Sequence, residues 1–161
     1  LYLQVVASDN AVCTLQITDT GGSHSFPAME RLAIQRGQAF ILVYAVNNRK
    51  SFDNLKNYYN EILSVKSTIE GTPLMIVGNK CDCLERDVAE SEGLRLAKQW
   101  SCSFIETSAK QEFHTRELFE QLLLLEKRQS MSLTEAQTHK KSGPSKSSKR
   151  AENIKNKCNL M

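Results

Sequence analysis

Asn79, Lys80 and Asp82 follow an apolar run and a glycine, in the pattern Asn-Lys-x-Asp. The run, residues 74–77, is short and aliphatic, which predicts a strand buried on both faces. Ligands of open α/β sheets bind beyond the carboxyl ends of the strands, where these polar side chains would lie. A carboxylate can accept two N–H donors from the edge of a guanine, while the Asn amide bonds the same base and the Lys stem lies over it. A polar turn after a strand remains the alternative reading.

Two further predicted strands end in residues suited to metal, phosphate and base binding. One strand stops at Asp19, and Gly22 follows three positions later. An Asp at a strand end can hold Mg²⁺ through water, and a glycine lets a backbone N–H approach a phosphate. The other strand is followed by Ser108, Ala109 and Lys110. A small residue there can offer its backbone N–H to the base.

These motifs, in the order D-x-x-G, N-K-x-D and S-A-K, resemble the Ras superfamily of small GTPases. The resemblance runs from about Tyr2 to Lys127 and returns at the last four residues. It implies an α/β fold, the P-loop NTPase-like G domain of the Ras type. Such a domain has a doubly wound, mostly parallel sheet with an antiparallel hairpin at one edge. The stretches that look most like the Di-Ras branch are Asp19–His24, Phe26–Met29, Ala39–Tyr44 and Glu117–Phe119.

The resemblance implies GTP or GDP and Mg²⁺ as ligands and gives the motif residues their roles. Asp19 is expected to serve Mg²⁺ through water, and Gly22 to contact the γ-phosphate. The expected guanine contacts are Asn79, Asp82 and Ala109, with Lys80, Ser108 and Lys110 in support.

Ser23 stands directly after the Gly of D-x-x-G. Most Ras-family members place there a glutamine that orients the attacking water. Serine is shorter and has no amide to reach both water and phosphate. We therefore expect Gly22 and Ser23 to form a weak catalytic pair, with slow GTP hydrolysis and a largely GTP-loaded state.

The sequence contains no match to G-x-x-x-x-G-K-[ST], the loop that in the family cradles the phosphates. The Thr of the first switch is missing too, because the sequence begins within the strand that follows it. In the family the first strand lies between the strand ending at Asp19 and the strand 39–46. Its removal should leave buried backbone groups unpaired, so we expect an N-terminally truncated chain with impaired nucleotide binding. The alternative is a pseudo-GTPase that binds a partner protein without nucleotide.

A short helix is predicted over residues 28–36, between Pro27 and Gly37. In the Ras family this segment is the second switch, which presents apolar groups to effector and regulator proteins. Those groups would be Phe26, Met29 and Leu32, with inward packing as the alternative.

The composition fits one ordinary globular domain, which we place at residues 1–128: 40% of the 161 residues are hydrophobic and 24% are charged. The five cysteines form no C-x-x-C pair, which indicates reduced thiols in a cytosolic protein. No apolar run approaches the ~20 residues of a membrane span.

The other predicted elements are strands 3–7, 12–18, 39–46 and 103–107, and helices 52–66 (capped by Ser51), 91–100 and 115–127.

Residues 129–161 lose the periodicity and are predicted to be a disordered basic tail. From His139 to Met161 there are seven Lys or Arg and one Glu, a net charge of +6, which leaves −3 for the rest of the chain. A mildly acidic domain does not suggest a nucleic-acid-binding face.

The chain ends in Cys158-Asn159-Leu160-Met161, which matches C-a-a-X and predicts farnesylation of Cys158, although Asn159 is not aliphatic. One lipid chain anchors only marginally, and basic residues near an anionic leaflet add ~1 kcal/mol each. Together they predict a lipid anchor on the cytoplasmic side of the plasma membrane. The alternative, a tail that binds nucleic acid or acts as a nuclear address, leaves Cys158 unexplained.

Overall fold

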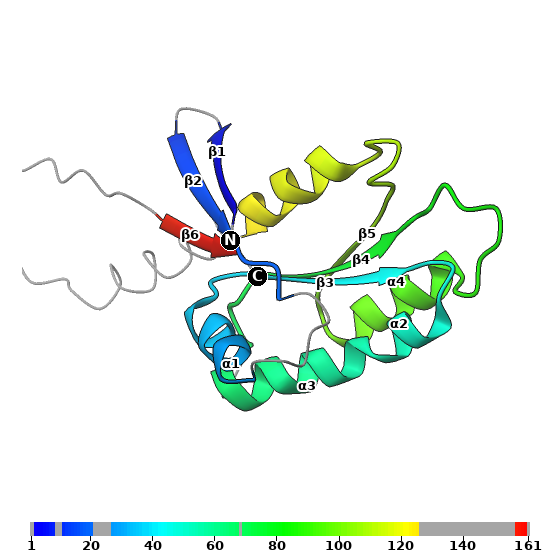
Figure 1. The fold of residues 1–161 in the computed structure, drawn as a ribbon, viewed down its shortest axis with the longest axis horizontal. Coiled ribbons are helices and arrows are strands. Elements are labelled where there is room, and N and C mark those ends of the chain that lie inside the picture. The colour runs from blue at the N-terminus through cyan, green and yellow to red at the C-terminus, as the bar shows by residue number, and fades with distance from the viewer. Residues whose placement is uncertain (1, 9–10, 21–26, 68, 126–156, 161) are drawn as a thin grey trace, which may run out of the picture.

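The computed structural model describes residues 2–8, 11–20, 27–67, 69–125 and 157–160 of the chain. For residues 2–8, 11–14, 27 and 157–160 it describes the backbone alone. In chain order the elements are β1 (Tyr2–Ser8), β2 (Ala11–Ile17), α1 (Pro27–Arg36), β3 (Phe40–Ala45), α2 (Arg49–Asp53), α3 (Leu55–Lys66), β4 (Leu74–Asn79), α4 (Glu90–Gln99), β5 (Ser103–Thr107) and β6 (Lys157–Leu160) (Figure 1). Residues 115–125 form a further helix, which follows β5.

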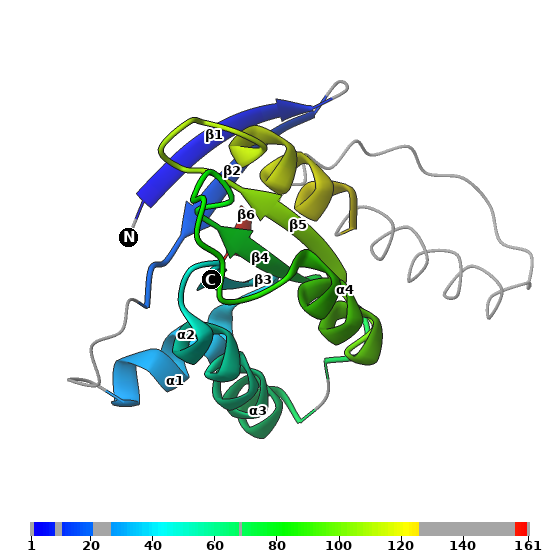
Figure 2. The ribbon, with the colours of Figure 1, turned by 90° about the vertical axis from the view of Figure 1, so that its right-hand side faces the viewer.

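Strands β3, β4 and β5 form a parallel sheet with β4 in the middle. Helices α3 and α4 cover one face and the helix of residues 115–125 covers the other (Figure 2). The first face packs around Leu55 and Ile76, and the second around Met75 and Leu122. All residues of β4 except its last are therefore buried. This arrangement confirms the α/β class and the doubly wound, parallel sheet that the sequence predicted.

Strands β1 and β2 form the predicted antiparallel hairpin, in a register that pairs Tyr2 with Ile17. In the described part of the chain, β2 and β3 belong to two separate three-stranded sheets. Leu15 nevertheless joins the two halves, because it is 1% exposed and packs in the cluster of Met75 and Leu122. The second neighbour of β2 is β6, which the sequence pattern placed in the basic tail.

The helix that the sequence predicted over residues 52–66, with Ser51 as its cap, is in fact two helices, α2 and α3. Asn48 caps α2, since its side-chain oxygen accepts a hydrogen bond from the Ser51 backbone N–H at 3.1 Å. The Ser51 hydroxyl instead donates to the Asn48 backbone oxygen at 2.7 Å. Asn and Ser both favour this position, so the sequence alone does not separate them.

Gly93 lets α4 approach the sheet at the site where Tyr44 and Phe104 pack. A Cβ on Gly93 would lie 2.6 Å from Phe104 Cζ and 2.8 Å from the Tyr44 hydroxyl oxygen. Tyr44 is 1% exposed, and its hydroxyl has no hydrogen-bond partner among the described residues. Burial, together with the nearby Glu106 carboxylate, raises the pKa of Tyr44 to about 12. The ring and its neutral hydroxyl therefore occupy the space that a side chain at position 93 of α4 would need.

The substitution Gly93→Ala should destabilise the fold by about 1–3 kcal/mol, because overpacking exceeds the ~1 kcal/mol that alanine gains over glycine in a helix. Urea unfolding followed by circular dichroism measures the change. Ser91→Ala, on the exposed side of the same helix, is the matched control and should be neutral or slightly stabilising. Equal stabilities of the two variants would show that α4 shifts away at little cost.

Candidate functional site

The side chain of Asn79 joins the ends of β4 and β5. Its Oδ1 accepts hydrogen bonds from the backbone N–H of Ala109 at 3.1 Å, from Thr107 Oγ1 at 3.3 Å and from the Lys80 N–H at 2.8 Å. These groups meet because Asn79 and Thr107 are paired at the carboxyl ends of parallel strands. The Asn-Lys-x-Asp and Ser-Ala-Lys motifs thus form one site at this edge of the sheet.

Asp82 is held by the serine of the second motif. Its Oδ1 accepts a hydrogen bond from Ser108 Oγ at 2.5 Å, and Ser108 is fully buried. The Ser108 hydroxyl oxygen in turn accepts the Gln111 N–H at 3.1 Å. The hydrogen bond from Ser108 lowers the pKa of Asp82 below its ordinary value, with smaller contributions from the charges of Lys110 and Lys80. The carboxylate is therefore ionised and fixed in position at neutral pH.

The backbone turns sharply between Asn79 and Asp82. Lys80 has a φ of 66°, in the left-handed region, and the Cys81 N–H donates to the Thr107 oxygen at 3.1 Å. This turn brings Asp82 over the end of β5. Lys80, Ala109 and Lys110 are exposed, so the long lysine side chains flank the site.

Two arginines anchor the loop that connects Asp82 to α4, Arg86 through an ion pair and Arg49 through a hydrogen bond to the Asp87 backbone oxygen at 2.6 Å. Arg86 binds Glu106 of β5 through both guanidinium Nη atoms. Arg49 of α2 binds both oxygens of Glu92, at 2.9 and 2.8 Å, and lowers the pKa of that carboxyl to about 2. Sequence reasoning missed all four residues, because their pairing over 20 and 43 positions leaves no local pattern.

The first residue of the D-x-x-G motif follows a strand of the other sheet. Asp19 follows β2 and is exposed, while Gly22 and Ser23 lie outside the described residues. Where the structure describes the chain, no three His, Cys, Asp or Glu side chains gather in a way that could hold a metal ion. The binding of Mg²⁺ by Asp19 through water stays a prediction.

Helix α1 carries two of the apolar groups predicted to face partner proteins. Met29 is 68% exposed and Leu32 is 43% exposed, so neither packs inward. Phe26 lies outside the described residues.

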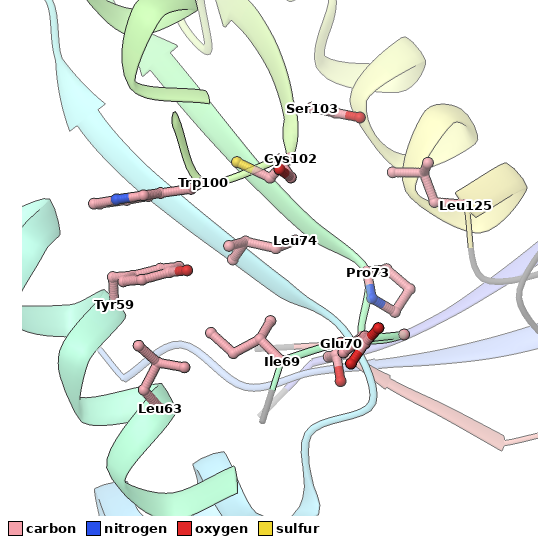
Figure 3. A pocket seen from close by; sticks show the side chains of 13 residues that line it. Tyr59, Leu63, Ile69, Glu70, Pro73, Leu74, Trp100, Cys102, Ser103 and Leu125 are labelled. Carbon is pink, nitrogen blue, oxygen red and sulfur yellow. The ribbon is translucent and has the colours of Figure 1, made fainter. Parts of the chain in front are cut away.

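A pocket of about 570 Å³ opens at the opposite end of the central sheet, where β4 and β5 begin (Figure 3). Tyr59 and Trp100 stack beside it with their rings 4.1 Å apart. Burial raises the pKa of Cys102, a free thiol in its lining, to about 11, so this thiol stays protonated and unreactive. The pocket contains none of the motif residues.

The edge formed by Asn79, Asp82 and Ala109 carries the kinds of hydrogen-bonding group that a guanine base would need. An ionised carboxylate is a double acceptor, and guanine presents two adjacent N–H donors on one edge. The Asn79 amide nitrogen can donate to the same base. The Ala109 N–H, predicted to bind the base, donates to Asn79 in this structure.

Comparison with known proteins shows sequence similarity over almost the whole chain. The family model for the Ras family matches residues 1–127. The chain is 49% identical to the GTP-binding protein Di-Ras1 of Mus musculus over 160 residues, 99% of this chain and 78% of that protein. It is 50% identical to Di-Ras2 of Mus musculus, with 99% and 78% covered, and 47% identical to drn-1 of Caenorhabditis elegans, with 90% and 68% covered.

The substitution Ser108→Ala should raise the pKa of Asp82 towards its ordinary value of 3.8, because it removes the principal hydrogen bond to the charged form. A lowered pKa means that this bond stabilises the fold fully above pH 3.8 and that the contribution is lost as pH falls through the lowered pKa. The variant should therefore lose part of the acid-range pH dependence of stability. A carboxyl NMR titration measures the pKa directly.

Ser64→Ala is the control for this titration, since the Ser64 hydroxyl donates to the Glu61 backbone oxygen on α3. An Asp82 pKa that does not change in Ser108→Ala would contradict the assignment.

Proposed function

The chain belongs to the Ras family, and on this premise we propose that it is a GTP-binding molecular switch in small-GTPase signal transduction. The observation that carries the proposal is the site in which Asn79, Asp82, Ser108 and Ala109 are joined by hydrogen bonds. At the carboxyl edge of the central sheet, the Asp82 carboxylate held by Ser108 is an acceptor, and the Asn79 amide nitrogen can donate.

In this proposal each residue of the site has its own role in nucleotide binding. Asp82 accepts the paired N–H groups of guanine, the Asn79 amide binds the same base, and the stem of Lys80 covers it. Ser108 positions Asp82 and Lys110 adds positive charge. Mg²⁺, where bound, offsets phosphate charge, and Asp19 would hold it through water.

Intrinsic hydrolysis would be slow. Ser23 stands directly after Gly22, and its side chain lacks the amide that orients the attacking water. We propose that, once nucleotide is bound, hydrolysis is slow and the GTP-loaded state is long-lived. Exposed Met29 and Leu32 on α1 support a surface for effector and regulator proteins.

We place the protein at the cytoplasmic face of the plasma membrane. None of the helices in the described ranges is long and apolar enough to cross a membrane. The attachment proposed is a farnesyl group on Cys158, helped by the basic residues before it.

The substitution Asp82→Asn should lower the affinity for GDP and GTP by about 10- to 100-fold, because a charge-assisted acceptor is replaced by a neutral amide that also donates. Affinity for xanthosine diphosphate should rise, since xanthine carries a carbonyl where guanine carries an amino group. Fluorescent-nucleotide titration measures both affinities, with Asp87→Asn in the same loop as the control.

The nucleotide content of the purified, denatured chain, measured by ion-exchange chromatography, is the companion measurement. A cooperatively folded protein that binds neither nucleotide would overturn the proposal and favour a nucleotide-independent partner-binding module.

In the GTP-loaded protein, Ser23→Gln should raise single-turnover hydrolysis by about ten-fold or more, because the amide can orient water. Ser23→Ala is the control and should leave the rate near that of the parent. Equal rates for the Gln and Ser proteins would refute the assignment of slow hydrolysis to Ser23. The assignment of the base site would be unaffected.

A further inference from the structure

The loop that carries Asp82 runs from β4 to α4 over residues 80–89, and we call it the base loop. Ser108 holds Asp82 near the start of this loop. Leu84, two positions after Asp82, is fully exposed, so burial does not fix the middle of the loop. The position of Asp82 therefore depends also on how the far end of the base loop is held.

The turn between β3 and α2, residues 46–48, holds the far end of the base loop through its backbone. The Val46 oxygen accepts the N–H groups of Asp87 and Val88 at 2.9 and 3.0 Å. The Val46 N–H donates to the Asn79 oxygen, at the end of β4, at 2.9 Å. Val46 and Val88 are both fully buried. One buried residue of the turn thus binds the chain on both sides of Asp82.

Arg49, the first residue of α2, binds the same end of the base loop through its side chain. Its Nη2 donates to the Asp87 backbone oxygen at 2.6 Å. Both Nη atoms donate to the Glu92 carboxylate, at 2.9 and 2.8 Å. Glu92 lies on α4 and also accepts the Ala89 N–H at 3.1 Å. The guanidinium therefore joins α2, the end of the base loop and the start of α4.

Arg49 acts through geometry more than through charge. Its side chain is 42% exposed and that of Glu92 is 25% exposed, so water screens the attraction between them. The planar guanidinium nevertheless reaches the Asp87 oxygen and both carboxylate oxygens in a single orientation. Loss of Arg49 should therefore loosen the base loop while the stability of the whole fold changes little.

We propose that Arg49 is a positioning residue for base specificity. It holds the base loop so that the Asp82 carboxylate faces the two adjacent N–H groups of guanine, although its own contacts are with Asp87 and Glu92. The inference rests on the proposed function, because it names a residue that sets the selectivity of the same site.

Hypoxanthine is the base that measures this selectivity. It lacks the 2-amino group of guanine, so it offers Asp82 one N–H where guanine offers two. A site built to bind both N–H groups discriminates against the analogue that lacks one of them. The discrimination depends on the direction of the carboxylate, and hence on how firmly the base loop is held.

Amide hydrogen exchange of the chain, after removal of nucleotide, tests the positioning. Arg49→Met keeps an unbranched stem and removes the guanidinium. The base loop should then exchange about three-fold or more faster, while exchange in β3, β4 and β5 is unchanged. Lys50→Met, the same kind of change at the next and exposed residue of α2, is the matched control and should leave the base loop as it is in the parent.

Unchanged exchange in the base loop of Arg49→Met would overturn the proposal. An equal acceleration in the base loop and in the three strands would also overturn it, because Arg49 would then stabilise the fold as a whole.

Base discrimination tests the consequence for specificity. The measured quantity is the affinity for GDP divided by the affinity for inosine diphosphate, which carries hypoxanthine. This ratio should fall about three-fold or more in Arg49→Met and should keep its parent value in Lys50→Met. A merely structural role would lower both affinities together and leave the ratio unchanged.

An unchanged ratio in an Arg49→Met chain that binds GDP would overturn the role in specificity. A parent chain that binds neither nucleotide would refute the proposed function and this role together. Hydrogen exchange would still decide whether Arg49 holds the base loop.

Discussion

The side-chain oxygen of Asn79 is the point on which the geometry of the candidate site depends. It accepts from a residue of its own loop, from the end of β5 and from the loop after β5. Parallel pairing of β4 and β5 brings these donors within reach of one acceptor. Because these interactions exist within the protein itself, the position of Ala109 is set before any ligand arrives, as the hydrogen bond from Ser108 sets that of Asp82, and less ordering is needed on binding.

The hydrophobic core connects this site to the other half of the molecule. Strand β2, which leads to Asp19, is in a different sheet from β4 and β5, which lead to Asp82 and Ala109. In the described chain, Leu15 and Ile17 make this connection by packing in the cluster of Met75, Val77 and the helix of residues 115–125. In the described chain, the position of Asp19 relative to Asn79 therefore depends on the packing of apolar side chains, and not on a continuous hydrogen-bonded sheet.

The strands, the α/β class and the meeting of two motifs at one edge could be predicted from sequence, because apolar runs followed by polar residues are local signals. The boundary between α2 and α3 could not, since Asn48 and Ser51 both suit a helix cap and only the fold selects between them. The ion pair of Arg49 with Glu92 joins distant positions whose charges look like ordinary surface residues. Strand β6 has too few residues to show a period, so its pairing with β2 could not be predicted either.

The stacked pair of Tyr59 and Trp100 has an optical consequence. Trp100 is the single tryptophan of the chain, and its ring lies nearly parallel to that of Tyr59, at an interplanar angle of 10°. Both rings line the pocket at the amino ends of β4 and β5 (Figure 3). Asn79 and Thr107 are paired at the carboxyl ends of the same strands. Tryptophan fluorescence therefore comes from the end of the sheet opposite to Asn79. A change in it when nucleotide is added would be a readout of motion transmitted through β4, free of direct quenching by the base.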